Sequence, residues 1–190
     1  MNSNELTVMW SVFWMYWAIA AIAERLKVKR EYSGEKRIGR MLHLLVVIAA
    51  FYVTFSPSRF SHLDRILIPQ SVAVEYLGTG ILFLSLSFAV WARRTLGRNW
   101  SGAIQKVAGQ RVIQEGPYKY VRNPIYTGII CGFLGTFVAM GTVSALLGFL
   151  IILTAYIIKI KNEEQFLIRV FGKEYETYMQ KSWALFPYLF

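Results

Sequence analysis

The sequence contains very little cysteine and histidine. Cys131 is the only cysteine among the 190 residues, and His43 and His62 are the only histidines. A single cysteine excludes an intrachain disulfide and any CxxC metal site. Because the two histidines are also far apart in the sequence, the chain offers no ligand set for a structural zinc ion. We therefore expect no metal.

The motifs of several common enzyme classes are also absent. The sequence has no GxGxxG loop, P-loop, HExxH or GxSxG motif, which are the signatures of dinucleotide binding, phosphate binding, zinc proteolysis and serine hydrolysis. The first 23 residues lack a basic start and a small-residue cleavage site, so they do not indicate a cleavable signal peptide. The chemistry is expected to need neither a covalent nucleophile nor a metal.

Acidic residues are scarce relative to basic ones. The 11 Asp and Glu residues against 21 Lys and Arg give a net charge of +10. This charge does not indicate nucleic-acid binding, because the basic residues lie in blocks between apolar stretches. Hydrophobic residues make up 55% of the chain, above the roughly 45–50% of soluble domains. The composition therefore predicts a single integral membrane domain.

Five apolar segments are expected to cross the membrane. They cover about residues 6–23, 41–56, 71–92, 125–140 and 143–159. A span needs roughly 20 helical residues, with about 17 as a lower limit, so the second, fourth and fifth segments are short. Only Gly141 and Thr142 separate the last two segments, which predicts a tight helical hairpin.

Charge in the connections predicts the orientation. Residues 24–40 carry seven Lys and Arg against three acids, and residues 93–122 carry seven against one. The connection at 57–70 has only two basic residues, and the hairpin tip has none. The positive-inside rule then places the N-terminus outside and the C-terminus in the cytoplasm. In a prokaryote, this membrane would be the cell inner membrane.

The end of the chain differs from the spans. Residues 162–181 mix charge with a helical stripe of apolar side chains, which predicts an amphipathic helix along the cytoplasmic face. The predicted fold is thus all-α, with five transmembrane helices and a cytoplasmic C-terminal helix. Residues 93–124 and 160–190 are expected on the cytoplasmic side.

Residues 116–128 form a polar loop that turns abruptly into the fourth apolar segment. The loop contains two prolines, three tyrosines and the pair Arg122 and Asn123. Pro124 suits the first position of a helix, and Asn123 before it is a favoured N-cap. These residues could simply make a good helix start. The N–H groups and positive dipole end of such a helix also attract an anion, and Arg122 stands beside them.

A second polar group, Glu163 and Glu164, follows the fifth apolar segment. Glu163 precedes three apolar residues by three, four and seven positions, so it shares the helix face that is expected to pack inward. A solvated acid pair is the simpler interpretation. The spacing nevertheless makes Glu163 a candidate for a partly buried acid, with Lys159 four residues earlier as a partner.

Three separated blocks together resemble the isoprenylcysteine carboxyl methyltransferase family, and related patterns occur in phospholipid N-methyltransferases. The blocks are LGRNWS at 96–101, GQRVIQEGPYKYVRNPIYTG at 109–128, and the acid pair followed by FGKEYETY at 171–178. The resemblance runs from about residue 91 to the end of the chain. Two positions differ from the family pattern. Asn123 stands where the family usually has histidine, and Lys159 stands where it tends to have arginine.

The resemblance implies an integral membrane methyltransferase that uses S-adenosylmethionine and a lipophilic acceptor, among membrane lipids. The first acceptor that it implies is an isoprenylcysteine-like carboxylate, and a phospholipid amine or a small thiol is the alternative. An NADPH-dependent membrane reductase and a non-catalytic lipid-binding protein are further alternatives. We expect neither nucleic acid nor metal as a partner.

The resemblance also assigns candidate site residues. Glu163 and Arg122 are the catalytic candidates, and Glu163 would accept the proton if the acceptor were an amine. The candidates for cofactor binding are Gln110, Val112, Tyr120, Val121, Arg122, Asn123, Tyr126, Glu163 and Glu164.

Overall fold

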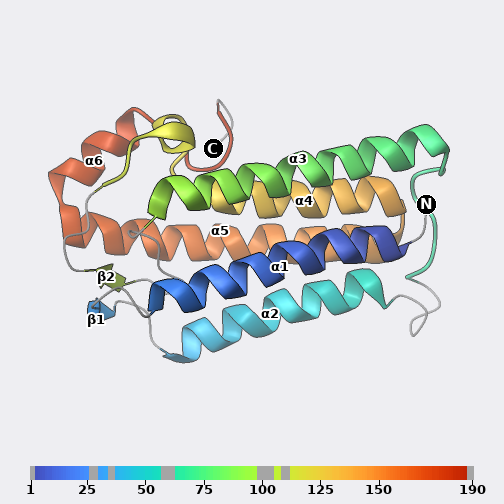
Figure 1. The fold of residues 1–190 in the computed structure, drawn as a ribbon, viewed down its shortest axis with the longest axis horizontal. Coiled ribbons are helices and arrows are strands. Elements are labelled where there is room, and N and C mark those ends of the chain that lie inside the picture. Colours follow the sequence, from blue (N-terminus) through green and yellow to red (C-terminus); the bar gives the residue numbers. More distant parts are fainter. Residues whose placement is uncertain are drawn as a thin grey trace.

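The computed structural model describes residues 3–25, 30–33, 37–56, 63–97, 105–107 and 112–187. Five long helices run side by side along the long axis of the molecule (Figure 1). In chain order the elements are α1 (Ser3–Arg25), β1 (Arg30–Ser33), α2 (Arg37–Phe55), α3 (Val72–Leu96), β2 (Gln105–Val107), the 3-10 helix η3 (Gly116–Lys119), α4 (Pro124–Met140), α5 (Val143–Phe171) and α6 (Lys173–Gln180).

Four of these helices, α1, α2, α3 and α5, are long and apolar enough to cross a membrane. Their outward faces carry exposed large apolar side chains, such as Val8, Leu45 and Leu84, as helices that face lipid require. Helix α4 matches the fourth predicted segment but has only 17 residues. It is also the most enclosed helix, with Ile129, Ile130 and Phe133 almost fully buried.

The all-α prediction is incomplete, because the structure contains two short strands. Strands β1 and β2 pair antiparallel, with Arg30 opposite Val107 and Ser33 opposite Gln105. They have four and three residues, too few for a recognisable alternation of polar and apolar side chains. Their pairing joins the two most basic connections of the chain at one end of the bundle (Figure 1).

The predicted boundary after the fifth span also differs from the structure. Helix α5 continues without a break for 29 residues, past Glu163 and Glu164. The chain then turns at Gly172, whose φ of 56° is left-handed, and α6 has only 8 residues. The two acids therefore lie on the extension of a membrane-length helix, which gives them a rigid support.

Helices α4 and α5 form the predicted hairpin. Gly141 ends α4 with a φ of 65°, and the Thr142 side chain accepts a hydrogen bond from the Ala145 amide at 3.3 Å. The Gly141 carbonyl also accepts a hydrogen bond of 2.7 Å from the Leu67 amide. The connection before α3 is thereby fastened to the hairpin tip.

Glycine allows α3 and α4 to approach closely. A Cβ atom at Gly135 would lie 2.6 Å from the Leu82 amide nitrogen and 2.7 Å from the Gly78 carbonyl oxygen, so only glycine fits there. At the next residue of α4, the Trp10 ring nitrogen donates a hydrogen bond of 3.0 Å to the Thr136 hydroxyl. Helix α4 is thus held by both α1 and α3, which fixes where its first residues point.

Candidate functional site

The candidate site lies at the end of the bundle where η3, the start of α4, the last turns of α5 and the C-terminal segment come together (Figure 1). We call this set of residues the loop–tail cluster: residues 118–127 from the loop and α4, Glu163 and Glu164 from α5, and residues 178–185 from the tail. The sequence blocks that carried the family resemblance are therefore partly brought together in space.

The loop and the tail are joined by backbone hydrogen bonds. The Arg122 amide donates to the Trp183 carbonyl at 2.8 Å, and the Trp183 amide donates to the Tyr120 carbonyl at 2.9 Å. The Asn123 amide continues this pairing with the Ala184 carbonyl at 3.2 Å. Val121 and Trp183 form a parallel bridge, so the two segments act as one unit.

The Arg122 side chain joins three parts of the cluster. Its Nε donates to Glu164 Oε1 at 2.7 Å, and both side chains are about one-tenth exposed. Its Nη1 donates to the Met179 carbonyl at 3.2 Å and to the Ser182 carbonyl. The Arg122 donors thus have a carboxylate and two backbone carbonyls as acceptors, and hydrogen bonds with a charged partner are the stronger kind. Arg122 therefore fixes the tail and Glu164 against the loop.

Asn123 occupies the N-cap position of α4, but its side chain makes no cap hydrogen bond. The predicted side-chain cap is therefore wrong. Its Nδ2 donates instead to the Ala184 carbonyl at 3.1 Å and to Glu164 Oε1 at 3.4 Å. The tail carbonyl, which sequence spacing cannot place, competes for this side chain. Thr127 reinforces the contact by donating to the Leu185 carbonyl at 2.9 Å.

Glu163 lies on the other side of the cluster and is partly buried. Its helical spacing relative to the apolar residues that follow it predicted this burial. The Tyr126 hydroxyl donates to Glu163 Oε2 at 2.6 Å. The Tyr126 ring also packs on the Tyr156 ring, with centroids 4.8 Å apart. One carboxylate is thus oriented by a tyrosine, and the neighbouring carboxylate is oriented by an arginine.

Tyr178 from the tail and Tyr118 from the loop also join the cluster. The Tyr178 hydroxyl donates to the Tyr118 carbonyl at 2.6 Å. Burial is the main reason that the pKa of Tyr178 is raised above its ordinary value, so its hydroxyl remains a donor. Burial also raises the pKa of Tyr118, with smaller contributions from Tyr178 and Glu163 and an opposing one from Arg93.

The other cofactor candidates that the structure describes differ in their exposure to solvent. Val121 is buried, whereas the Tyr120 side chain is 60% exposed. Val112 is partly buried just before η3, and Gln110 lies outside the described residues. The structure therefore brings together the side chains of Arg122, Asn123, Tyr126, Glu163 and Glu164.

Sequence reasoning missed Arg93 and the tail carbonyls. Arg93 is only 2% exposed, and its guanidinium lies 5.3 Å from the centre of the Trp17 ring. Its position at the end of an apolar segment resembled an ordinary cytoplasmic flank. Backbone acceptors such as the Ser182 and Ala184 carbonyls carry no residue-type signal.

A cavity of about 370 Å³ lies between Arg122 and the tail residues 179–184. Among the described residues, no group of three or more His, Cys, Asp or Glu could hold a metal ion.

Comparison with known proteins gives a consistent picture. The family model described as "Phospholipid methyltransferase" matches residues 74–174. A probable protein-S-isoprenylcysteine O-methyltransferase from Oryza sativa subsp. indica is 27% identical over 152 residues, which is 76% of this chain and 80% of that protein. The protein-S-isoprenylcysteine O-methyltransferase of Schizosaccharomyces pombe is 38% identical over 71 residues, 37% of this chain and 30% of that protein.

A solved structure shows the same fold. It is the eukaryotic intramembrane Ras methyltransferase ICMT (isoprenylcysteine carboxyl methyltransferase), with a TM-score of 0.60 and 20% identity over 78% of this chain. The chain spans 53% of the length of that protein. The four helices that are long and apolar enough to cross a membrane support an integral membrane protein with this fold. The family match extends over more than half of the chain and confirms the resemblance to isoprenylcysteine carboxyl methyltransferases, so the protein is a methyltransferase that belongs to the phospholipid methyltransferase family.

Proposed function

We propose that the protein transfers a methyl group from S-adenosylmethionine to a lipophilic acceptor, and that this acceptor is an isoprenylcysteine-like carboxylate. The observation that carries the proposal is the pair of oriented acids in the loop–tail cluster. Tyr126 holds Glu163 at 2.6 Å and Arg122 holds Glu164 at 2.7 Å. The names of the relatives from Oryza sativa and Schizosaccharomyces pombe support the acceptor.

The chemistry of the cluster fits the proposed cofactor. S-adenosylmethionine carries a sulfonium, an ammonium, a carboxylate and a purine. Glu163 and Glu164 offer negative charge to the cationic groups, and the Tyr126 ring offers an aromatic face. Because the Asn123 side chain does not cap α4, the first N–H groups of that helix suit a carboxylate. We propose that these residues, together with Val112, Tyr120, Val121 and Gln110, hold the cofactor.

When bound, the cofactor supplies an electrophilic methyl group. The protein then has to position the acceptor oxygen in line with that group and exclude water. A carboxylate acceptor is already deprotonated at neutral pH, so no general base is required. Arg122 is bonded to Glu164 and to tail carbonyls, which makes it a positioning residue. Glu163, which accepts a hydrogen bond from the neutral Tyr126 hydroxyl, is the acid beside the reacting groups.

A phospholipid amine is the second candidate acceptor, because the matching family model is described as "Phospholipid methyltransferase". An amine must lose a proton during the reaction. The partly buried Glu163 carboxylate is positioned to accept this proton. The two acceptors therefore assign different roles to the same residue.

We further propose that α4 is a fifth membrane span. Its 17 residues extend over about 25 Å at 1.5 Å per residue, close to the lower limit for a span. The two basic connections meet in the β1–β2 pair at the end of the bundle that also holds α6 (Figure 1). By the positive-inside rule this end is cytoplasmic, with the N-terminus outside and, in a prokaryote, the inner membrane as the location.

Direct binding of the cofactor tests the proposed function. We expect purified protein in detergent to bind radiolabelled S-adenosylmethionine saturably and NADPH not at all. Glu163→Gln should weaken this binding at least about 10-fold, because a charge-assisted contact is worth about 1.5–3 kcal/mol. Glu176→Gln is the matched control, because Glu176 is an exposed acid on α6. Saturable NADPH binding, or no S-adenosylmethionine binding by folded wild type, would contradict the proposal.

A further inference from the structure

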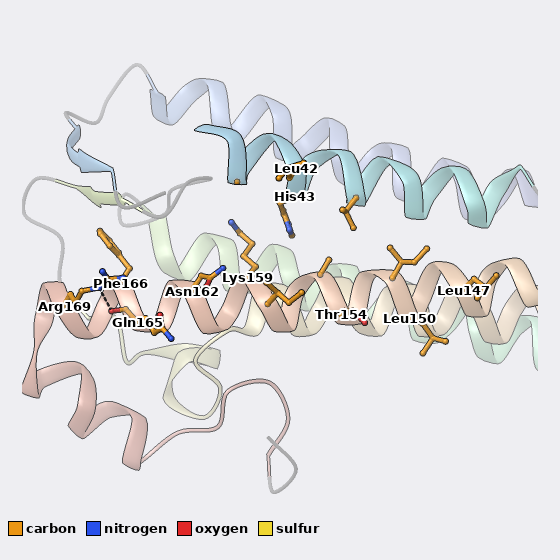
Figure 2. Close-up of a pocket in the computed structure, with 15 residues that line it drawn as sticks. Leu42, His43, Leu147, Leu150, Thr154, Lys159, Asn162, Gln165, Phe166 and Arg169 are labelled. Carbon is orange, nitrogen blue, oxygen red and sulfur yellow. Dashed lines mark hydrogen bonds between the residues drawn. The ribbon is translucent and has the colours of Figure 1, made fainter. Parts of the chain in front are cut away.

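A large cavity lies between α2 and α5, separate from the loop–tail cluster. Its volume is about 820 Å³, within the range of roughly 300–1,000 Å³ that is usual for small-molecule sites. Figure 2 shows its lining side chains spread along α2 and α5, between the two helices. We call this cavity the α2–α5 groove.

One half of the α2–α5 groove is apolar. It is lined by Leu42 and Val46 from α2 and by Leu147, Leu150 and Ile151 from α5. Leu42 is 57% exposed and Leu150 is 44% exposed, so both present apolar surface to whatever occupies the space. This half suits one long hydrocarbon chain.

The other half is polar and basic. Lys159, Asn162 and Arg169 line it from one face of α5, and ten residues of helix extend over about 15 Å. His43 projects from α2 toward Lys159 (Figure 2). Among the described residues that line the groove, none is acidic. The exposed Arg169 places a positive charge at the end of this half, which suits an anionic ligand.

The groove and the loop–tail cluster meet at a series of packed rings. The His43 ring, which lines the groove, lies edge-on to the Tyr156 ring with centroids 5.1 Å apart. Tyr156 packs on Tyr126 at 4.8 Å, and Tyr126 donates to Glu163. Lys159 precedes Glu163 by one helical turn. The part of a bound ligand that contacts Lys159 would therefore lie beside the proposed reaction centre.

We propose that the α2–α5 groove binds the methyl acceptor and that Arg169 determines which acceptors bind well. The hydrocarbon chain occupies the apolar half, the reacting group lies near Lys159, and the rest of the polar part extends along Asn162 to Arg169. The acceptor is thus an amphiphile whose polar part is anionic beyond its reacting group. This inference rests on the proposed function.

Arg169 can be changed without disturbing the fold. Its side chain is exposed, and its Nε donates a local hydrogen bond of 3.2 Å to the Gln165 carbonyl in the preceding turn. Reversal of its charge should therefore change ligand preference and leave cofactor binding intact. Lys173 is the matched control, because it is an exposed base on α6 that does not line the groove.

The test measures the Kd of fluorescent prenylcysteine peptides that carry glutamate, glutamine or lysine just before the prenylated cysteine. Wild type should bind the glutamate peptide at least about fivefold more tightly than the lysine peptide. Arg169→Glu should reverse this order, and Lys173→Glu should keep it. An unchanged order in Arg169→Glu, or no peptide preference in wild type, would overturn the inference.

A second variant tests the apolar half of the groove. Leu150→Trp should weaken binding of a long prenyl chain at least about fivefold more than binding of a short one, whereas Leu84→Trp on the outer face of α3 should affect neither. Equal effects on long and short chains would place the acceptor elsewhere. Binding of S-adenosylmethionine, measured on the same samples, separates these outcomes from failure of the proposed function, because none of the described cofactor candidates lines the groove.

Discussion

Glu164 is the residue on which the loop contacts converge. Arg122 donates to its Oε1 at 2.7 Å and Asn123 donates to the same oxygen at 3.4 Å. Arg122 also reaches the Met179 and Ser182 carbonyls. These contacts require the planar fork of a guanidinium, because a lysine ammonium on a flexible chain cannot satisfy all of them at once. The charge alone is therefore not sufficient at this position.

We predict that Arg122→Lys weakens S-adenosylmethionine binding at least about 10-fold and makes the tail after α6 more sensitive to protease. The conservative change keeps the positive charge but loses the hydrogen bonds that fasten the tail. Arg94→Lys is the control, because Arg94 is exposed near the end of α3. Wild-type affinity and wild-type protease resistance in Arg122→Lys would show that the guanidinium does not position the site.

At the scale of elements, α4 determines where Asn123 and Tyr126 point. The helix is short and enclosed, and its close contact with α3 depends on glycine. A Cβ at Gly135 would lie 2.6 Å from the Leu82 nitrogen, whereas a Cβ at Gly80 has nothing within 4 Å. Both glycines lie inside helices and share the helical backbone conformation. The two positions therefore differ only in the room that surrounds an added Cβ atom.

We predict that Gly135→Ala lowers the apparent melting temperature in detergent and reduces cofactor binding, because overpacking costs about 1–3 kcal/mol. Gly80→Ala should leave the melting temperature unchanged or raise it, since alanine favours a helix by up to about 1 kcal/mol. Equal melting temperatures for the two variants would show that the α3–α4 contact can widen without cost.

At the scale of the whole molecule, local sequence patterns predicted the long helices but neither the two short strands nor the long-range backbone contacts. Apolar length and the Gly141-Thr142 break predicted the helices and the hairpin, because both depend on neighbouring residues. Helical spacing also predicted that Glu163 lies on the inward-packing face of its helix. The pairing of Arg122 with tail carbonyls did not, because those carbonyls belong to Met179 and Ser182, about 60 residues away. The continuation of α5 through its charged turn was missed for a related reason: tertiary packing overrides a local change in composition.

The transfer of labelled methyl groups tests the central claim most directly. Wild-type protein in lipid nanodiscs would be given labelled S-adenosylmethionine with a prenylcysteine peptide or with phosphatidylethanolamine. We predict label in the prenylcysteine product, released as methanol by mild base because it is a methyl ester, and at least about 10-fold less label with Glu163→Gln. Label that resists base and appears in phosphatidylethanolamine alone, or no transfer to either acceptor by protein that binds the cofactor, would contradict a carboxyl methyltransferase.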